Sequence, residues 1–387
     1  MKKTVLFLHP SSDLYGADRS LLRTIKAITE MDIRVVVCLP YHGELEDHIR
    51  PLDCEVHVFG LGVMRRKYFS FPRIIGFGVG LIYAFIKVYL LARKEKAVAI
   101  HSNTTSLVVG PFVARAVGIP HIQHVREILV SPVFLRKFTA KLASRLSSRV
   151  IAVSQSVVQN LMIDEPQIEK KTIVINNGID PNRYQVGNGQ ATRARWNIPN
   201  AATVVMMIAR VHWWKGQDLF LKVAESLQVS DDQVYFMCVG SPFQGNEHLM
   251  DELFKSRNGL PDPNRFIIVP FQSRVSDYLD AADIFLLPST LPDPFPTTVL
   301  EAMAMSKAIV VNGHGGACDM IIQGESGYIV RPPNDVEGFV HYVKKLLDDQ
   351  SLRIQLGEHA QSRLNKHFTE SMYCQKIQEL FRDIAFQ

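Results

Sequence analysis

Two carboxylates and two cations carry the most informative chemistry in this sequence. Asp293 and Glu301 are separated by seven residues in the segment DPFPTTVLEAMA, and Arg210 and Lys215 lie roughly 80 residues upstream. Carboxylates hold the hydroxyl pairs of sugars and ribose, whereas Arg and Lys bind the oxygens of a diphosphate. The combination therefore predicts a site for a sugar linked to a nucleoside diphosphate, and with it glycosyl transfer.

The two carboxylates are expected in different local structures. Asp293 lies in a Pro-rich loop, where the alternative role is an Asx-type turn. Glu301 is expected in the first turn of a helix that begins at Thr297 or Thr298, where free backbone amides of residues 297–299 favour a phosphate. The alternative for Glu301 is a capping box with Thr298.

The two cations follow a strand. Residues 203–209 read as a buried strand and residues 216–227 as an amphipathic helix, which places Arg210 and Lys215 in the loop at the carboxyl end of the strand. Ligands bind at that edge of open α/β sheets. Cations fixed there would stabilise the charge that develops on a departing diphosphate. The alternative is two solvated loop charges.

Five segments of the chain resemble retaining glycosyltransferase family 4. IARVHWWKGQDLFLKVA is similar to the family's Gly-Arg-x4-Lys-Gly turn, and ADIFLLPSTLPDPFPTTVLEAMAMSKAIVVNGHGG to its Glu-x7-Glu segment. NNGID at 176–180, YGADRS at 15–20 and QHVRE at 123–127 extend the resemblance to nearly the whole chain. It implies an α/β GT-B fold, in which two Rossmann-like domains with parallel sheets face each other across a cleft. It also implies retention of configuration, no metal ion, and no cofactor apart from the nucleotide sugar as co-substrate.

The resemblance also implies roles for individual residues. The donor would bind on the C-terminal domain and the acceptor on the N-terminal one, with His124 against the donor sugar and Gly16 allowing close backbone approach. The implied sets are catalytic His124, Arg210, Lys215 and Asp293; donor-binding Gly16, Arg210, Lys215, Phe295, Thr297, Thr298 and Glu301; and acceptor-binding Ser102, Asn103 and Arg126. Without the resemblance, His124 is better explained as a histidine that caps a core strand.

Four positions depart from the family pattern. Asp293 stands where Glu is usual, Pro296 and Ala209 stand where Gly is usual, and Asp319 replaces the Glu after the Gly-Gly loop. None of these changes removes a charge that the chemistry needs. They point to donor choice rather than to a different reaction.

Length and pattern predict two domains. The 387 residues are 47% hydrophobic, and six strand-like runs in each half alternate with helical patterns, as in parallel sheets. Residues 184–202 are polar and broken by Gly and Pro, which is typical of a linker. We expect an N-terminal domain over 1–182, joined by a C-terminal helix over 371–387, and a donor-binding domain over 183–370.

Cysteines and the N-terminus favour a cytoplasmic protein. Five cysteines form no C-x-x-C pair, which is typical of reduced thiols and argues against zinc. The apolar run from Val5 to Leu8 is too short for a secretory signal and reads as a first strand.

Charge and two apolar segments predict contact with the inner leaflet of the cell membrane. Residues 1–180 hold 24 Lys and Arg against 15 Asp and Glu, a surplus of +9, whereas residues 181–387 hold 19 against 23. No nucleic-acid-binding motif accompanies the basic half, so we expect an anionic membrane surface rather than nucleic acid. An interfacial helix is expected over 131–149, with cations at 137, 141, 145 and 149 beside Phe134, Phe138, Leu142 and Leu146.

The second apolar segment, residues 74–91, carries one charge, Lys87. A strand follows closely and both flanks are basic, which argues against a transmembrane span. A buried core helix and a membrane-docked helix both remain open.

Together these observations predict a retaining hexosyltransferase. The donor would be a UDP sugar rather than a GDP sugar, and the acceptor a glycan or lipid-linked glycan of cell-surface polysaccharide synthesis. Two alternatives are a nucleotide-sugar 2-epimerase-like isomerase and a catalytically silent sugar-nucleotide-binding protein.

Overall fold

The computed structural model describes residues 2–14, 16–65, 68 and 70–385. Tyr15 of the YGADRS segment, and Arg66 and Lys67 in the basic flank before residues 74–91, lie outside the described residues. The chain divides into two compact units. Unit 1 comprises Met1–Asn177 with Glu370–Gln387, and unit 2 comprises Gly178–Thr369. The expected boundary at 182/183 falls slightly later than this division.

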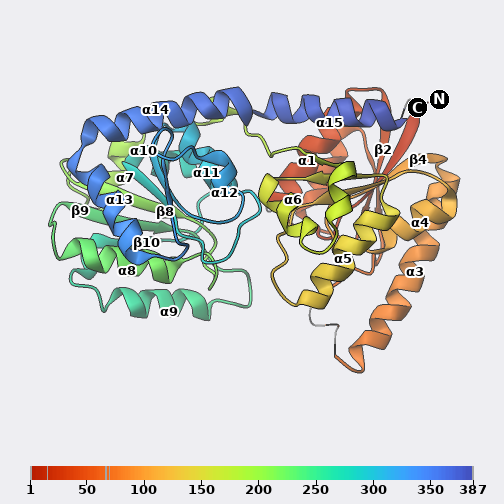
Figure 1. Cartoon of the computed structure of the whole chain (residues 1–387), viewed down its shortest axis with the longest axis horizontal. Coiled ribbons are helices and arrows are strands. Elements are labelled where there is room, and N and C mark those ends of the chain that lie inside the picture. Colours follow the sequence, from red (N-terminus) through yellow and green to blue (C-terminus); the bar gives the residue numbers. More distant parts are fainter. Residues whose placement is uncertain (1, 15, 66–67, 69, 386–387) are drawn as a thin grey trace. The chain divides into compact units, whose positions relative to one another are not determined.

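Unit 1 is built on a seven-stranded parallel sheet (Figure 1). The strand order is β3-β2-β1-β4-β5-β6-β7. The strands are β1 (Lys3–Leu8), β2 (Ile33–Leu39), β3 (Glu55–Val58), β4 (Ala97–Ser102), β5 (His121–Val125), β6 (Arg149–Ala152) and β7 (Thr172–Val174).

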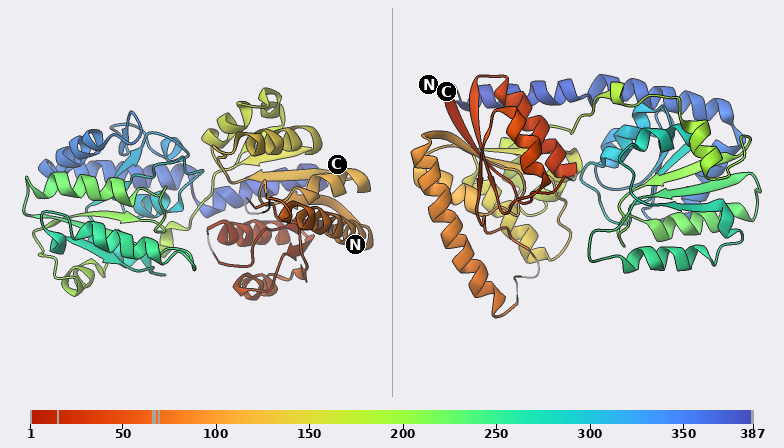
Figure 2. Two further views of the ribbon diagram at one scale, coloured as in Figure 1. Left: turned by 90° about the horizontal axis from the view of Figure 1, so that it is seen from below. Right: turned by 180° about the vertical axis from the view of Figure 1, so that it is seen from behind.

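Helices cover both faces of this sheet, as Figure 2 shows. They are α1 (Gly16–Thr29), α2 (Glu44–Ile49), α3 (Arg73–Lys94), α4 (Val109–Val117), α5 (Val133–Leu146), α6 (Gln155–Met162) and α15 (Glu370–Ala385), with 3-10 turns at Arg50–Leu52 and Pro166–Lys171. Side chains of β1 alternate between two cores: Val5 and Phe7 pack with α1 and α15, and Leu6 and Leu8 pack with α3 and α4. A strand buried on both sides explains the unbroken apolar run in its sequence.

Unit 2 repeats the architecture with a six-stranded parallel sheet, in the order β10-β9-β8-β11-β12-β13. Its strands are β8 (Thr203–Ile208), β9 (Val234–Val239), β10 (Phe266–Val269), β11 (Ile284–Leu287), β12 (Ala308–Asn312) and β13 (Tyr328–Val330). Its helices are α7 (Gly189–Arg195), α8 (Gln217–Gln228), α9 (His248–Arg257), α10 (Val275–Ala281), α11 (Thr297–Ala304), α12 (Ala317–Met320), α13 (Val336–Asp348) and α14 (Gln350–His367), with 3-10 turns at Pro181–Arg183 and Pro263–Arg265.

Each sheet has a topological switch point, because the strand order reverses between β1 and β4 in unit 1 and between β8 and β11 in unit 2. In open α/β sheets, ligands bind outside the carboxyl ends of the strands at that point. The segments that follow β1, β4, β8 and β11 carry most of the predicted site residues. The fold therefore places the predicted chemistry at two switch points, one in each unit.

The structure corrects three expectations about local structure. The residues of β3 were not predicted as a strand, and α7 lies within the segment that was predicted to be a linker. Helix α5 ends at Leu146, so Arg149 does not lie on it but begins β6.

Candidate active site

The turn from β8 to α8 positions both predicted cations of unit 2. Gly216 is the N-cap of α8 in the left-handed region, at φ 89°. A Cβ at Gly216 would lie 1.9 Å from the Pro288 carbonyl oxygen, so the turn is pressed against the end of β11 and requires glycine there. Gln217 Nε2 donates to the Arg210 carbonyl at 2.9 Å. The loop that carries Arg210 and Lys215 is thus tied down at both ends.

Each cation lies against an aromatic ring. The Arg210 guanidinium stacks over Phe243 at 3.3 Å from the ring centroid, and Lys215 Nζ lies 4.2 Å from the centroid of Trp214. Lys215 Nζ also forms a close ion pair with Asp293 Oδ2. Contacts of this kind hold a flexible cationic side chain in one place. Sequence reasoning missed both aromatic partners: Trp214 is the neighbour of Lys215, but Phe243 comes from the loop after β9.

Asp293 is oriented by the loop that follows β12. Gly316 N donates to the Asp293 carbonyl oxygen at 2.7 Å, and Cβ atoms at Gly315 and Gly316 would collide with the backbone of Asp293 and Pro294. The Gly-Gly pair therefore permits two loops to touch. Asp293 is 8% exposed and its carboxylate pairs with Lys215, so the Asx-turn alternative is wrong.

Helix α11 begins at Thr297, one of the two expected positions, but Glu301 lies in its second turn rather than its first. The N-cap is Pro296 and no side chain caps the helix, so the capping-box alternative is wrong. Glu301 Oε1 instead accepts a hydrogen bond from the Tyr184 hydroxyl at 3.2 Å. Tyr184 lies in the linker segment, and no motif identified it in advance.

Two further features, one in α11 and one in the loop before it, limit what this region can offer a ligand. The Val299 N–H is engaged with the Pro296 carbonyl at 3.2 Å, so of the three predicted amides it is the one already used. The amides of Thr297 and Thr298 belong to the first turn, where no intrahelical partner exists. Phe295 is buried and its ring packs edge-on against Phe368, with centroids 5.7 Å apart. A donor would therefore meet the backbone rather than the ring of Phe295.

His314 is a residue of this region that sequence reasoning missed. It precedes Gly315 in the loop against Asp293, and both of its ring nitrogens are buried without a hydrogen-bond partner among the described residues. Burial lowers the pKa of His314, and the negative charge of Asp293 partly opposes that shift. A neutral, unsatisfied imidazole is thereby held near the Asp293–Lys215 pair.

In unit 1, polar side chains meet at the ends of β1 and β4. His9 Nε2 lies 2.6 Å from Asp18 Oδ1, and His9 Nδ1 lies 2.9 Å from the amide nitrogen of Asn103. Ser102 Oγ pairs with His121 Nε2 at 2.9 Å. Ser102, the last residue of β4, and Asn103, which follows it, are thus buried and bonded within the unit.

Arg126 connects this cluster to two other parts of unit 1. Its Nε donates to Asn103 Oδ1 at 3.0 Å, its Nη1 to Asn177 Oδ1 at 2.9 Å, and its Nη2 to the Tyr373 hydroxyl at 3.4 Å. Tyr373 lies on α15, so the C-terminal helix is joined directly to the predicted site. Sequence reasoning missed this link because Tyr373 is distant in the chain.

His124 is fully buried at the end of β5. Its Nδ1 lies 3.3 Å from Arg126 Nη2, and because a guanidinium only donates, the proton of a neutral ring is on Nε2. Burial, followed by the charge of Arg126, lowers the pKa of His124 well below its usual value. Its Nε2 has no hydrogen-bond partner among the described residues. Gly16, the remaining predicted residue, is exposed at the start of α1.

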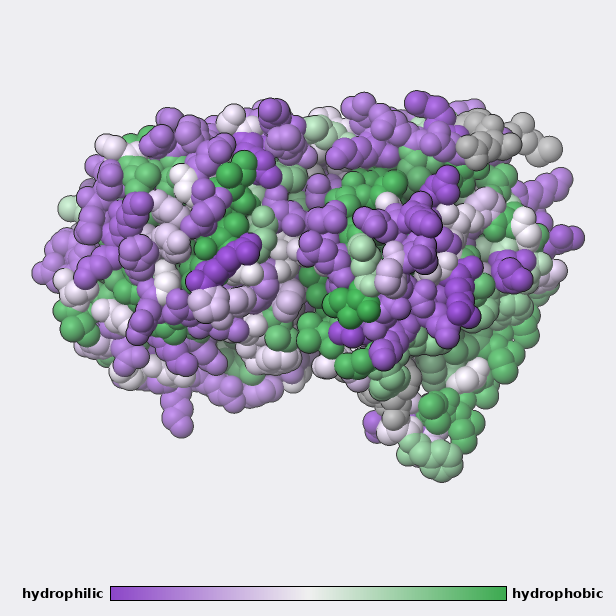
Figure 3. Space-filling view, in the orientation of Figure 1, coloured by the Kyte–Doolittle hydropathy of each residue, from purple (hydrophilic) through white to green (hydrophobic). Residues whose placement is uncertain are grey.

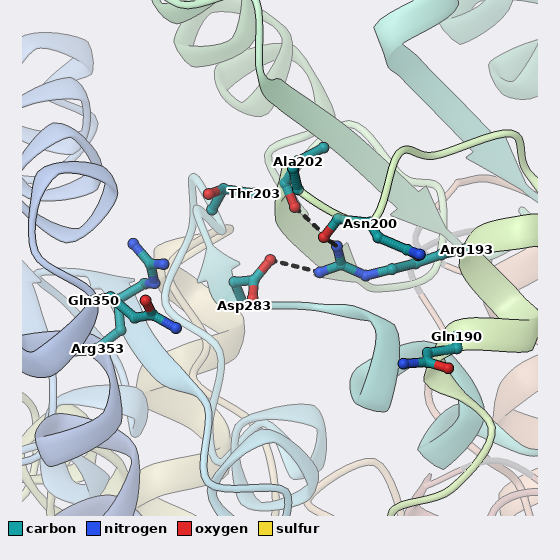
Figure 4. A pocket seen from close by; sticks show the side chains of 9 residues that line it. Gln190, Arg193, Asn200, Ala202, Thr203, Asp283, Gln350 and Arg353 are labelled. Carbon is teal, nitrogen blue, oxygen red and sulfur yellow. Dashed lines mark hydrogen bonds and ion pairs between the residues drawn. The ribbon is translucent and has the colours of Figure 1, made fainter.

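A polar pocket lies at the opposite, amino-terminal edge of the unit 2 sheet (Figure 4). Arg193 there donates to Asp283 at 2.7 Å and to the Ala202 carbonyl at 2.8 Å, and Arg353 donates to the Leu347 carbonyl at 3.1 Å. These cations are engaged by the protein itself. The pocket contains none of the predicted site residues.

Solved structures that share the fold of this protein over nearly its whole length define the fold class. Anabaena Alr3699/HepE in complex with UDP has a TM-score of 0.85 at 24% identity, covering 99% of this chain and 100% of that one. A glycosyltransferase from Rickettsia africae has a TM-score of 0.83 at 18% identity, covering 99% and 98%. With its two parallel-sheet, Rossmann-like units, the protein has the GT-B fold.

Sequence comparison then gives the family. Residues 15–183 match the family described as Glycosyltransferase Family 4, and residues 189–363 match Glycosyl transferases group 1. The capsular polysaccharide biosynthesis glycosyltransferase CapM of Staphylococcus aureus is 24% identical over 312 residues, 77% of this chain and 80% of that protein. The UDP-Gal:alpha-D-GlcNAc-diphosphoundecaprenol alpha-1,3-galactosyltransferase of Escherichia coli is 21% identical over 392 residues, 96% and 95% of the two chains. The chain belongs to glycosyltransferase family 4, as its motifs predicted.

Proposed function

We propose that this protein transfers a hexosyl group from a UDP sugar to a glycan or lipid-linked glycan during cell-surface polysaccharide synthesis. The transfer would retain anomeric configuration and proceed without a metal ion. Unit 2 would bind the donor, and unit 1 would bind the acceptor through the region of Ser102, Asn103 and Arg126.

The observation that carries the proposal is the Lys215–Asp293 pair at the switch point of unit 2. A diphosphate bound by Arg210 and Lys215 would replace the carboxylate as the counter-ion of Lys215. Asp293 would then be free to accept hydrogen bonds from the donor sugar, and Glu301 from ribose hydroxyls. Two fixed cations beside the leaving group supply the charge stabilisation that the reaction needs.

The names of the relatives support the substrate class. One curated relative is a capsular polysaccharide glycosyltransferase, and another transfers galactose from UDP to a diphosphoundecaprenol-linked acceptor. Alr3699/HepE, of the same fold, was crystallised with UDP and with UDP-glucose. These names favour UDP over GDP and a lipid-linked acceptor over a free sugar.

The test is donor turnover by the purified protein across a panel of UDP and GDP sugars, with and without EDTA, followed by mass spectrometry. Slow hydrolysis of one donor should be lost in Lys215→Met. Lys222→Met, an exposed lysine on α8, is the matched control and should keep full activity. Epimerised donor without acceptor would instead indicate the isomerase, and binding without any product would indicate the silent protein.

A further inference from the structure

Helix α3 presents an apolar surface to solvent. It has 22 residues with a mean hydropathy of 2.1 in its most apolar window, of which 17% is buried, and by length and composition alone it could cross a membrane. Its four buried residues are Ala84, Val88, Leu91 and Ala92, all in the carboxyl-terminal half. That half packs on α4 and the sheet, whereas the low burial of the helix as a whole decides against a helix wholly inside the core.

The amino-terminal half of α3 extends away from the rest of unit 1. Figure 1 and the right-hand view of Figure 2 show it projecting beyond α4 and α5, and Figure 3 shows hydrophobic surface over it. Ile75, Val79 and Ile82 lie at helical spacing on its outer side and are 57%, 63% and 64% exposed. Residues 73–83 span about 16 Å of helix, more than enough for the 5–10 Å depth of an interfacial helix.

The amino-acid composition of the amino-terminal half of α3 is unfavourable for a helix exposed to water. Cβ atoms at Gly76, Gly78 and Gly80 would meet nothing within 4 Å, so no close contact within the described unit requires glycine there. Glycine lowers helix stability in water relative to alanine. Three glycines among exposed isoleucines and valines indicate a helix that is completed by an apolar environment.

The part of the sequence that contains these helices is strongly basic. Residues 59–149 contain fifteen Lys and Arg but two acids, Glu95 and Glu127, a net charge of +13. Helices α3 and α5 contain no acidic residue, and Lys137, Lys141 and Arg145 of α5 are exposed beside Phe134 and Phe138. Helix α4 packs against both helices.

We propose that the amino-terminal half of α3, together with the exposed face of α5, forms a docking surface for an anionic phospholipid bilayer. The apolar stripe of α3 enters the acyl region, and the cations of α5 contact the phosphate headgroups. A second copy of the chain is a poor occupant, because a symmetric contact would bring one basic surface against another. The inference concerns a surface of unit 1, whereas the proposed donor site is in unit 2, and it does not depend on the chemistry proposed there.

Vesicle flotation tests the proposal with the full-length protein. Wild-type protein should float with phosphatidylglycerol-containing vesicles at low salt, and its binding should weaken as salt rises and on phosphatidylcholine alone. The triple variant Ile75→Gln/Val79→Gln/Ile82→Gln should lower the partition coefficient at least tenfold. Because these side chains are exposed, the variant should fold normally, as judged by circular dichroism.

A matched control and a charge variant sharpen the test. Val186→Gln/Val229→Gln/Ile354→Gln replaces three apolar residues of unit 2 that are each more than half exposed, and it should leave partition unchanged. Lys137→Gln/Lys141→Gln/Arg145→Gln should lose binding to anionic vesicles at least tenfold.

Three outcomes would overturn the proposal. They are wild-type protein that stays unbound at low salt, an α3 triple variant that binds like wild type, and a wild-type dimer that the α3 substitutions convert to monomer. Donor hydrolysis by the same α3 variant, assayed without vesicles, should match wild type. Loss of flotation with hydrolysis intact therefore separates this surface from the proposed function.

Discussion

Acidification from about pH 7.5 to about pH 5.5 should destabilise unit 1, because its buried histidines resist protonation. Burial lowers the pKa of His121 to about 3 and lowers the pKa values of His101 and His124 well below their usual value. In the unfolded chain these groups titrate near the ordinary value of about 6.5. Below that pH the unfolded state binds more protons than the folded state, so the free energy of unfolding falls as pH falls.

The magnitude follows from the size of the shifts. One pH unit below 6.5, each histidine that stays neutral in the folded state reduces stability by about 1.4 kcal/mol, so three reduce it by about 4 kcal/mol. Burial also raises the pKa of Glu127, which acts in the opposite direction and reduces the net loss. A few kcal/mol is a large part of the roughly 5–15 kcal/mol stability of a typical protein.

The assay must separate the two units. All three tryptophans, Trp196, Trp213 and Trp214, lie in unit 2, so their fluorescence during urea unfolding reports that unit alone. Pulsed hydrogen exchange of β1, β4 and β5 reports unit 1 in the same samples. We expect the urea midpoint of unit 1 to fall more than that of unit 2 on acidification.

A single substitution isolates the cause. His101 has no hydrogen-bond partner for either ring nitrogen among the described residues, and its ring packs 4.5 Å from that of Phe7. His101→Leu should therefore remove about a third of the three-histidine effect, or about 1.4 kcal/mol at pH 5.5. His48→Leu, at a half-exposed site on α2, is the control for losing a histidine. An unchanged pH dependence in His101→Leu would refute the reasoning.

Three further predictions concern unit 2. Gly216→Ala should destabilise the unit by about 2–4 kcal/mol, because residue 216 has a positive φ and the added Cβ would collide with the Pro288 carbonyl. Urea unfolding followed by tryptophan fluorescence measures this loss, and near wild-type stability would contradict the close approach of this turn to β11. Lys215→Met and Asp293→Asn should each lower the free energy of unfolding by about 3 kcal/mol, because each leaves a largely buried charge unpaired. The double variant should lose less than the sum of the two, and an additive double-mutant cycle would show that the pair is uncoupled. Tyr184→Phe should raise the donor KM about fivefold with little change in kcat, since it removes one hydrogen bond of about 1 kcal/mol that orients Glu301. A change confined to kcat would contradict a binding role for Glu301.

The sequence predicted strands with strong apolar runs and failed where the run was weak. Strand β3 carries Glu55 and His57 at alternate positions and forms the edge of its sheet, so its pattern is short and half polar. Helix α7 begins at Gly189 in a polar segment, and Gly189 N is held by Asp280 at 2.6 Å. A contact with a residue about ninety positions away leaves no local signal.

The site shows the same division between local and distant information. The positions of Arg210, Lys215 and Thr297 follow from strand and helix patterns, which are local. Phe243, the partner of Arg210, and Tyr184, the partner of Glu301, come from separate loops, and only the fold brings each pair together. For α3, an apolar composition suits a core helix and a membrane helix equally well, and exposure of its outer side is a property of packing that composition does not contain.

The ion pair between Lys215 and Asp293 would explain how a shortened acid could serve the proposed donor site. Asp293 is one methylene shorter than the usual Glu, yet the loop at Gly315 and Gly316 presses directly on its backbone and brings its carboxylate to Lys215. An unpaired lysine in this setting would be costly, and the pair avoids that cost while the site is empty. A diphosphate would take over the same lysine and release the carboxylate to the sugar. The charge of Lys215 would then be compensated both before and after the donor binds, and the reach of Asp293 would be set by the loop rather than by its own length.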